Sequence, residues 1–522
     1  MKSSENKASA CECINSPLNR MNVPARASVF FTVSNLAAKA CALIFTPIFT
    51  RLLTPAEYGT YSLFSSYLSV LLVLGSLELS GSVIIRVFQK YRESCSLCVL
   101  VASAISVLCS TAVFAVFILI RRIIHAPALF SGAEVLLYIM MISTSLINVY
   151  ISKSKFLYKW KSVLITTLVQ SLIIPILSIL LINVNYFKDM NHVGLKLGVA
   201  SAVMAACAVL FTVITFSSCI GEMREQRSDK RQLFSSIRGI CTSLLKLALP
   251  LLPYYFSVMI IAQSDRFFIS EYFDRNAVAI YSVAYSLGIA LNAVCSGITN
   301  SLCPWIMRKV RAGDFGKIRS TLNTLITVCI LSIICFLSLA SDLLSLIAPE
   351  EYTSGLPVVF IIALCPLPLS LSQVMSSVAI AKERVGGVVV SGVVPAVISV
   401  LSNAFLLQGK TVVFCAAITA LSYFLLGVIG ILNTRHICLS PLIGIAKSVQ
   451  KLLFLAVFAC VLYILNGSFA ARVAIGIAAG ILLLYKLKSA AWILKEGAVR
   501  FGKTEKSPKA NKKVSIYEKN HK

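Results

Sequence analysis

The stretch Leu247–Gly288, LALPLLPYYFSVMIIAQSDRFFISEYFDRNAVAIYSVAYSLG, decides the fold of this chain. It begins as an apolar run that carries two prolines and is long enough to cross a bilayer, which takes about 20 residues. Asp265 and Arg266 stand side by side toward the far end of that run. A charge in hydrocarbon is costly, so a membrane-spanning segment that carries two of them raises a question of function.

The composition of the whole chain is that of a membrane protein. Of the 522 residues, 58% are hydrophobic and 13% are charged, and the mean hydropathy is +0.86. These values are typical of polytopic membrane proteins and not of soluble domains. The first 26 residues are polar and basic, without the apolar core and cleavage site of a signal peptide, so none is expected.

The net charge of +27 invites a nucleic-acid interpretation, which the placement of the charges argues against. Lys and Arg stand between the apolar runs, whereas a nucleic-acid-binding face gathers them on one folded surface. The 17 cysteines are scattered, and Cys11 and Cys13 have no second pair at metal-binding spacing. We therefore expect no nucleic-acid partner and no metal site.

Fourteen apolar runs approach the length of a membrane span, and we predict an all-α polytopic membrane protein. Backbone groups in lipid must be hydrogen-bonded within their own segment, so each run is expected to be a helix. The predicted spans are 27–49, 60–83, 97–120, 134–151, 163–182, 197–217, 247–270, 278–302, 321–347, 356–380, 387–407, 412–432, 450–466 and 471–487.

The basic residues predict the orientation of these spans. With the N-terminus in the cytoplasm, the inner segments and the tail hold 38 Lys and Arg, and the outer loops hold 8. Lys and Arg accumulate in cytoplasmic loops, so both ends of the chain are predicted to be cytoplasmic. The longest outer loop, Asn183–Lys196, has about 14 residues under this assignment.

An internal repeat is visible at an offset of 220 residues. GTYSLFSSY then aligns with AIYSVAYSL, so that Tyr61 meets Tyr281, Ser62 meets Ser282, and the serines that follow also coincide. Both copies would begin in the cytoplasm, which makes the repeat parallel, as in two-lobed transporters. The predicted segments are an N-terminal segment 1–26, a six-helix lobe 27–217, a linker 218–246, a second six-helix lobe 247–432, two extra helices 433–487 and a basic cytoplasmic tail 488–522.

Polar residues follow one face of several predicted spans. In the first span Thr32, Asn35 and Lys39 are separated by helical steps, and Lys39 lies near the middle, where it cannot easily reach either surface. The predicted eighth span carries Ser282 and Asn292 in a similar stripe. Two interpretations stay open, close packing of small residues and the wall of a hydrated cavity. A cationic cavity would suit an anionic substrate.

The remaining charges within spans have two interpretations each. Asp265 and Arg266 are the 19th and 20th residues from Leu247, which predicts a position near the outer mouth, as an interfacial pair or as substrate ligands. Glu78 is 19 residues into its span and is predicted near the inner mouth, as a coupling-ion carboxylate or an interfacial charge.

No catalytic or cofactor-binding pattern is visible. The four histidines are dispersed, and neither a dinucleotide-binding nor a phosphate-binding glycine motif occurs. The connecting segments are also too short for a soluble catalytic domain. We expect neither enzymatic activity nor a cofactor.

Several stretches resemble one family of membrane exporters. RLLTPAEYGTYSLF (Arg51–Phe64), DRFFISEYFDRNAVAIYSVAYSLG (Asp265–Gly288) and LIAPEEYTSGLPVVFIIAL (Leu346–Leu364) are similar to segments of the polysaccharide-transport branch of the multidrug/oligosaccharidyl-lipid/polysaccharide exporter superfamily. The resemblance covers about residues 25–435, with soft motifs. It implies two six-helix lobes, alternating access driven by H⁺ or Na⁺, and a flippase for undecaprenyl-diphosphate-linked oligosaccharide in a bacterial inner membrane.

Our hypothesis is a flippase for lipid-linked oligosaccharide of O-antigen, capsule or another surface polysaccharide. Membrane lipids surround it, and a polysaccharide polymerase and a chain-length regulator are candidate partners. A multidrug-cation antiporter, another lipid-precursor exporter and a non-transporting scaffold are the alternatives. The candidate residues are Lys39 and Arg266 for the anionic diphosphate–sugar region, Glu78 and Asp265 for ion coupling, and Thr32, Asn35, Tyr61, Ser62, Tyr281, Ser282 and Asn292 for sugar hydroxyls.

Overall fold

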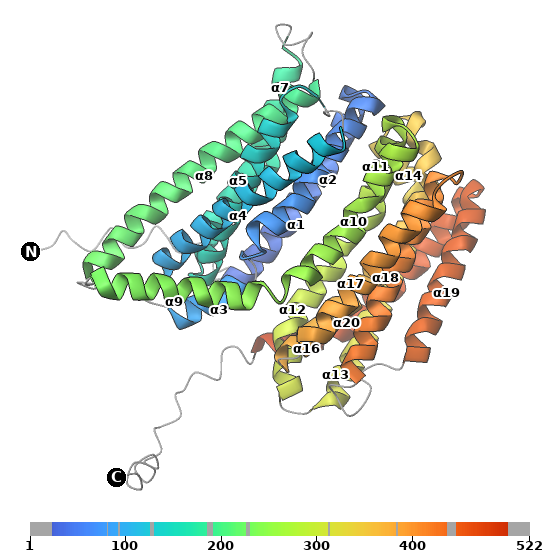
Figure 1. The fold of residues 1–522 in the computed structure, drawn as a ribbon. Coiled ribbons are helices and arrows are strands. Elements are labelled where there is room, and N and C mark those ends of the chain that lie inside the picture. The colour runs from blue at the N-terminus through green and yellow to red at the C-terminus, as the bar shows by residue number, and fades with distance from the viewer. Residues whose placement is uncertain are drawn as a thin grey trace, which may run out of the picture.

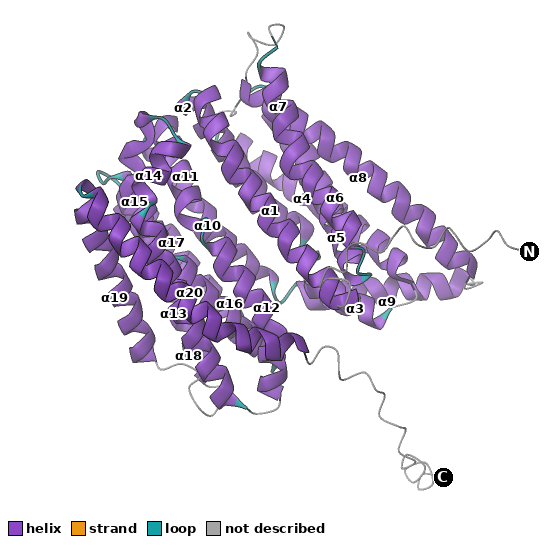
Figure 2. Ribbon diagram, turned by 180° about the vertical axis from the view of Figure 1, so that it is seen from behind, coloured by secondary structure: helices purple, strands orange, loops and turns teal. Residues whose placement is uncertain are grey.

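The computed structural model consists of two helical bundles that stand side by side (Figure 1). It describes residues 23–80, 82–91, 94–125, 130–184, 192–225, 230–311, 314–382, 385–435 and 445–499. Every regular element in these ranges is a helix (Figure 2), in agreement with the predicted all-α fold. Most of the N-terminal segment 1–26 and the final part of the basic tail lie outside the described residues.

The first bundle is formed by the helices that precede the middle of the chain. They are α1 (Val23–Leu52), α2 (Pro55–Ser76), α3 (Ser82–Lys90), α4 (Cys95–Ile123), α5 (Ala133–Phe156), α6 (Trp160–Leu168), the π-helical turn η3 (Val169–Ile173), α7 (Ile174–Ile182) and α8 (His192–Glu225). The helix α9 (Lys230–Ala248) then crosses from this bundle to the next, at the end of the molecule opposite the start of α2 (Figure 1).

The second bundle contains the rest of the described chain. Its helices are α10 (Leu252–Tyr272), α11 (Arg275–Ile289), α12 (Asn292–Arg311), α13 (Phe315–Ser338), α14 (Ala340–Ile347), η5 (Glu350–Gly355), α15 (Leu356–Ile362), α16 (Pro366–Ala381), α17 (Val385–Leu406), α18 (Val412–Arg435), α19 (Ile445–Ile464), η6 (Leu465–Gly467) and α20 (Phe469–Val499).

The helices α2 and α11 begin at equivalent positions of the predicted repeat. Thr54 and Glu57 form a capping box at the start of α2, each side chain accepting a hydrogen bond from the other residue's backbone N–H. Asp274 accepts a hydrogen bond of 2.7 Å from the backbone N–H of Ala277 at the start of α11. The two caps are 220 residues apart, the offset of the repeat, and the repeat of whole lobes stays a prediction.

Each of the fourteen predicted spans falls on a helix or on a run of helices. Twelve described helices are long and apolar enough to cross a membrane, and a bent pair made of α9 and α10 would be the thirteenth. The helix α1, which contains the first predicted span, is not among these twelve helices or the bent pair. The structure therefore supports twelve or thirteen spans, and the fourteenth stays a prediction.

Two of the predicted spans are interrupted in the structure. The span 60–83 is broken, because Leu77 and Glu78 have positive φ values of 50° and 47° and end α2 before α3 begins. The span 247–270 is interrupted near Pro250, where the chain turns by 51° between α9 and α10, because proline lacks the N–H of a helix interior. The last predicted span, 471–487, agrees with the candidate span Phe469–Leu487, and the helix α20 continues beyond it to Val499, so the predicted tail from residue 488 begins as helix.

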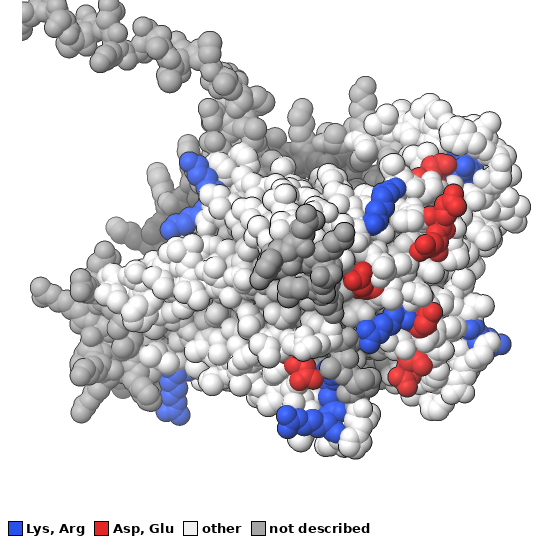
Figure 3. Space-filling view, turned by 90° about the horizontal axis from the view of Figure 1, so that it is seen from above, with Lys and Arg blue, Asp and Glu red and all other residues white. Residues whose placement is uncertain are grey.

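The largest buried hydrophobic cluster of the described residues includes side chains of both bundles. Phe49, Leu53, Tyr58 and Leu63 of the first bundle are buried in the same cluster as most of the buried residues of the second bundle. They flank the turn that joins α1 to α2, so the bundles are packed together at this end of the molecule. Seen from this end, the described surface shows acidic and basic side chains interspersed (Figure 3).

Candidate functional site

A cavity of about 850 Å³ lies between the bundles. Its wall in the first bundle comes from α1, α2, α5, η3, α7 and α8, and its wall in the second bundle comes from α10, α11 and α12. The lining includes six of the predicted site residues, Lys39, Tyr61, Ser62, Arg266, Ser282 and Asn292. Residues that the sequence places far apart are therefore brought to one site.

The cavity is cationic. Lys39 from α1, Lys196 from α8 and Arg266 from α10 all line it, and the described lining contains neither Asp nor Glu. Cationic side chains at the middle of a membrane protein are costly unless they meet carboxylates, water or a ligand. A cavity with this charge favours an anionic occupant.

Arg266 is held at the contact between the two bundles. Its Nε donates to Ser282 Oγ at 3.1 Å, and its Nη1 donates to Gln263 Oε1 at 3.1 Å. Ser282 Oγ in turn accepts from Ser62 Oγ of the first bundle, and Ser66 Oγ donates to Gln263 Oε1 at 2.9 Å. The network fixes the guanidinium plane at the cavity wall, with 6% of the side chain exposed.

The serines of the predicted repeat meet in this network. Ser62 on α2 and Ser282 on α11 occupy equivalent positions, and their hydroxyl groups are hydrogen-bonded to each other. Both also line the cavity. The two interpretations of the polar stripe, helix packing and cavity wall, therefore both hold for this pair.

Lys196 is a cavity residue that the sequence did not indicate. We placed it in an outer loop, but α8 begins at His192 and brings Lys196 into the helix, where the side chain is buried. Its Nζ lies 3.4 Å from the ring centroid of Tyr61 and 3.6 Å from that of Phe49. Such contacts with aromatic rings stabilise a cation that has lost water. The signal available in the sequence was that this lysine directly precedes a predicted span.

Asp265 does not form an interfacial pair with Arg266. The carboxylate is fully buried inside the second bundle and accepts hydrogen bonds from Tyr281 Oη, from Thr419 Oγ1 and, at 3.2 Å, from Asn403 Nδ2. Successive helix residues point in directions about 100° apart, so Arg266 can face the cavity while its neighbour faces the core. Asp265 lies about two thirds of the way along α10, which begins at Leu252, and its predicted position near the outer mouth stays a prediction.

Four other predicted residues have different outcomes. Tyr281 is fully buried and donates to Asp265, and it is absent from the cavity lining. Glu78 lies in the break between α2 and α3, and it is also absent from that lining. The side chains of Thr32 and Asn35 are outside the described residues, so their predicted roles stay predictions.

The bundles are joined by hydrogen bonds at one end of the cavity. Thr50 Oγ1 donates to Ile347 O at 2.8 Å, and Arg51 Nη2 donates to Leu346 O at 3.1 Å. Arg275 Nη1 donates to Thr60 Oγ1 at 2.8 Å. These bonds surround the end of α1 and the starts of α2 and α11, so they close the cavity at that end. We call this group the closed end.

Comparisons with known proteins place this architecture in a family. Residues 25–310 match the model of a family described as "Polysaccharide biosynthesis protein". The chain is also 22% identical over 286 residues to the "Lsg locus putative protein 1" of Haemophilus influenzae. That alignment covers 54% of this chain and 66% of the relative, so just under two thirds of the relative's length is matched.

Solved structures of transporters share the fold. The lipid II flippase MurJ in an inward closed conformation has a TM-score of 0.56 at 12% identity, covering 90% of this chain and all of that chain. An inward-facing multidrug resistance MATE family transporter has a TM-score of 0.54 at 13% identity, covering 78% and 98%. A transporter from Pyrococcus furiosus, described as having a binding pocket of reverse polarity, has a TM-score of 0.54 at 13% identity, covering 81% and 97%.

The matched family model covers more than half of the chain, and the shared transporter fold extends over most of it. Together with the cationic cavity between two bundles, these findings identify the chain as a multi-pass membrane protein that belongs to the polysaccharide biosynthesis protein family and has the fold of MATE and MurJ transporters.

Proposed function

We propose that this protein is a flippase that moves undecaprenyl-diphosphate-linked oligosaccharide across the bacterial inner membrane for a surface polysaccharide such as O-antigen or capsule. The single observation that carries the proposal is the cavity lined by Lys39, Lys196 and Arg266, with no carboxylate among its described residues. A diphosphate linkage supplies the negative charges that such a site lacks. Guanidinium and ammonium groups form their strongest hydrogen bonds with phosphate oxygens.

The rest of the cavity wall suits the sugar portion of this substrate. Its volume of about 850 Å³ lies within the range of small-molecule sites, roughly 300–1,000 Å³. Hydroxyl and amide groups are spread over both walls, where they can exchange hydrogen bonds with sugar hydroxyls. The polar neutral residues of the lining are Thr46, Tyr58, Tyr61, Ser62, Ser65, Ser66, Ser69, Gln170, Ser171, Ser178, Gln263, Ser282, Ser286 and Asn292.

The hydrogen bonds of the closed end indicate how the substrate would be moved. The bonds made there by Thr50, Arg51 and Arg275 join the two bundles on one side of the cavity. Alternating access requires that these bonds break while the bundles approach each other at the opposite end. In the predicted orientation the closed end faces outward, so the cavity would receive substrate from the cytoplasmic side.

The buried carboxylate of Asp265 is our candidate for ion coupling. Tyr281 of α11, Asn403 of α17 and Thr419 of α18 contact it, so four helices of the second bundle contribute polar side chains to one point. A carboxylate with neighbouring hydroxyl oxygens can accept a proton or coordinate Na⁺. We propose that binding of H⁺ or Na⁺ at Asp265 biases the packing of α10 against these helices. Glu78, the other candidate, stays a prediction.

The alternatives predict different cavities. A multidrug-cation antiporter needs anionic groups that attract a cation, and the described lining of this cavity holds cations. A scaffold needs no polar interior between its bundles. Another lipid-precursor exporter on the same fold would share the cationic site and differ in the group attached to the phosphate.

Neutral variants of the cavity cations test the proposal. In a strain that lacks the chromosomal gene, Lys39→Ala, Lys196→Met and Arg266→Gln should each lower surface glycan, by about tenfold or more, because each removes a charge-assisted bond to phosphate. Lys410→Gln is the matched control, because Lys410 is exposed outside the cavity. Surface glycan is measured by immunoblot, and the protein in the membrane fraction is measured in parallel.

Three outcomes decide against this function. Normal glycan export by Lys39→Ala would remove the substrate assignment. A change in drug susceptibility without a change in surface glycan would favour the antiporter. In a cysteine-free background, Ala42→Cys lines the cavity and should react with a water-soluble thiol reagent. Ile44 is absent from the cavity lining and is exposed on the outside of the helical bundle, where lipid would cover it, so Ile44→Cys should not react. Absence of labelling at residue 42 would favour the scaffold.

A further inference from the structure

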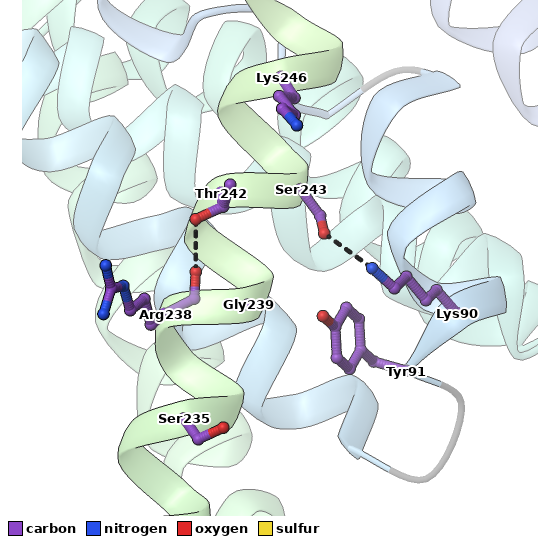
Figure 4. A pocket seen from close by; sticks show the side chains of 8 residues that line it. All are labelled: Lys90, Tyr91, Ser235, Arg238, Gly239, Thr242, Ser243 and Lys246. Carbon is purple, nitrogen blue, oxygen red and sulfur yellow. Dashed lines mark hydrogen bonds between the residues drawn. The ribbon is translucent and has the colours of Figure 1, made fainter.

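A second cationic pocket lies outside the cavity, between α3 and α9. The pocket has a volume of about 560 Å³, and its described lining is Lys90, Tyr91, Ser235, Arg238, Gly239, Thr242, Ser243 and Lys246 (Figure 4). We call it the α3–α9 pocket. None of these residues lines the cavity between the bundles, and the proposed transport mechanism uses none of them.

The helix α9 presents two different faces. Ile240, Leu244 and Ala248 are buried in a cluster with residues of α3 and α4, so the apolar face is occupied by the protein itself. The pocket residues of α9 recur every three or four positions and therefore form the opposite stripe. The polar stripe is open to the surroundings, and Arg238 and Lys246 are exposed on it.

The pocket has the charge and hydrogen-bond donors of an anion site. Lys90, Arg238 and Lys246 contribute three positive charges, and the described lining contains neither Asp nor Glu. Lys90 Nζ donates to Ser243 Oγ at 3.4 Å, which draws the ammonium group toward α9 (Figure 4). Hydroxyl groups of Tyr91 and Ser235 add further donors around the same space, whereas Thr242 Oγ1 donates to Arg238 O at 2.9 Å.

The position of the pocket is at the level of a membrane surface. Lys90 ends α3 a few residues before α4, a candidate span, and Lys246 lies six residues before α10 begins. The helix α9 runs across the bundle ends, at the end opposite the closed end (Figure 1). Residues at this depth lie among lipid headgroups. In the predicted orientation these headgroups belong to the cytoplasmic leaflet, where anionic lipids attract Lys and Arg.

The shape of the pocket depends on a glycine. A Cβ atom added at Gly239 would lie 2.7 Å from Tyr91 Oη, so only glycine lets the tyrosine hydroxyl lie against the helix at this point. The ring of Tyr91 then forms one wall, beside Lys90 (Figure 4). This close approach of a side chain to the backbone distinguishes the site from a set of unrelated surface charges.

We propose that the α3–α9 pocket binds the phosphate of an anionic phospholipid headgroup from the leaflet that α9 faces. The three cations attract the phosphate, and the hydroxyl groups of the pocket donate hydrogen bonds to its oxygens. The acyl chains extend into the bilayer beside α4 and α10. The site is independent of the transported substrate.

Lipid retention by the purified full-length protein tests the proposal. Native mass spectrometry follows adducts after incubation with phosphatidylglycerol, phosphatidylcholine, undecaprenyl diphosphate or inorganic phosphate. Phosphatidylglycerol should be retained by the natural sequence, and Lys90→Gln/Arg238→Gln/Lys246→Gln should reduce its retention about tenfold or more. The charge-matched control is Arg86→Gln/Lys159→Gln/Lys161→Gln, which alters exposed cations outside the pocket and should retain the lipid.

Two single variants keep the test valid if the triple variant does not fold. Arg238→Gln should weaken retention, and Gly239→Ala should weaken it without a change in charge, because the added Cβ displaces Tyr91. Equal loss in the triple variant and its control would overturn the site. Unchanged retention in Gly239→Ala would show that charge alone attracts the lipid. Stronger binding of inorganic phosphate or of undecaprenyl diphosphate at this pocket would overturn the phospholipid assignment.

Discussion

At the scale of single residues, the direction in which a side chain points decides its role more than the residue type does. Asp265 and Arg266 are neighbours in sequence, yet one is enclosed by Tyr281 and Asn403 and the other faces the cavity. The sequence showed that two charges were present in one span. Which of the two faces the cavity depends on how α10 packs against α11, α17 and α18. No local sequence pattern specifies that packing.

Lys196 illustrates the same limit. Hydropathy placed the start of its span one residue later, because Lys196 is charged and His192 lies a few residues before it. In the structure α8 begins at His192, whose Nδ1 lies 3.4 Å from Glu57 Oε1, so polar residues continue the helix beyond its apolar part. A search for apolar runs misses cavity residues near the ends of helices for this reason.

Replacement of Asp265 tests the coupling site. Asp265→Asn keeps the shape and removes the charge, so transport should lose its stimulation by a Na⁺ or H⁺ gradient, while Glu351→Gln, an exposed acid, should keep it. The measurement is the rate of substrate movement in proteoliposomes with and without each gradient. Stimulation of the Asn variant equal to that of the natural sequence would exclude Asp265 as the coupling carboxylate.

At the scale of elements, α2 and α11 determine how the bundles meet. The sequence repeat paired Ser62 with Ser282, and the structure brings these two residues together at the contact of the two helices. The offset, inferred from similarity alone, predicted that the two positions are equivalent, and their contact is a finding of the structure. The predicted span 60–83 ran through the break at Leu77 and Glu78, although the Gly and Ser residues of the stretch GSLELSGS (75–82) interrupt the apolar run there.

The close approach of α2 and α11 depends on Gly59. A Cβ at this position would lie 1.9 Å from the backbone oxygen of Arg275, so Gly59→Ala must push the helices apart. We expect a loss of about 1–3 kcal/mol in stability, the usual cost of overpacking. Gly198→Ala is the control, because a Cβ there meets nothing within 4 Å. Thermal unfolding in detergent measures both, and equal midpoints would contradict the predicted contact.

At the scale of the whole molecule, the fold could be predicted to a large extent. Every predicted span falls on a helix or on a run of helices, because length and hydropathy are sufficient to identify segments that cross lipid. The location of the cavity was predictable only in part. Lys39 and Arg266 were recognised because charges in apolar runs are rare, whereas lining residues such as Gln170 and Gln263 carry no such signal.

Alternating access can be tested by joining the bundles covalently. In a cysteine-free background, Ser62→Cys/Ser282→Cys should form a disulfide on oxidation, because the two hydroxyl oxygens are in hydrogen-bonding contact. Export should then stop and should return on reduction, since the closed end can no longer open. Each single cysteine variant serves as the control. Full export with the disulfide completely formed would show that these helices need not separate.

The bend between α9 and α10 has a mechanical consequence. The helix α9 is fixed to α3 and α4 of the first bundle, whereas α10 belongs to the second, and only the residues around Pro250 connect them. Any rotation of one bundle against the other must therefore be absorbed at this joint, with α9 as a lever arm roughly 28 Å long. The stiffness of α9 would therefore limit how far the two bundles can rotate against each other.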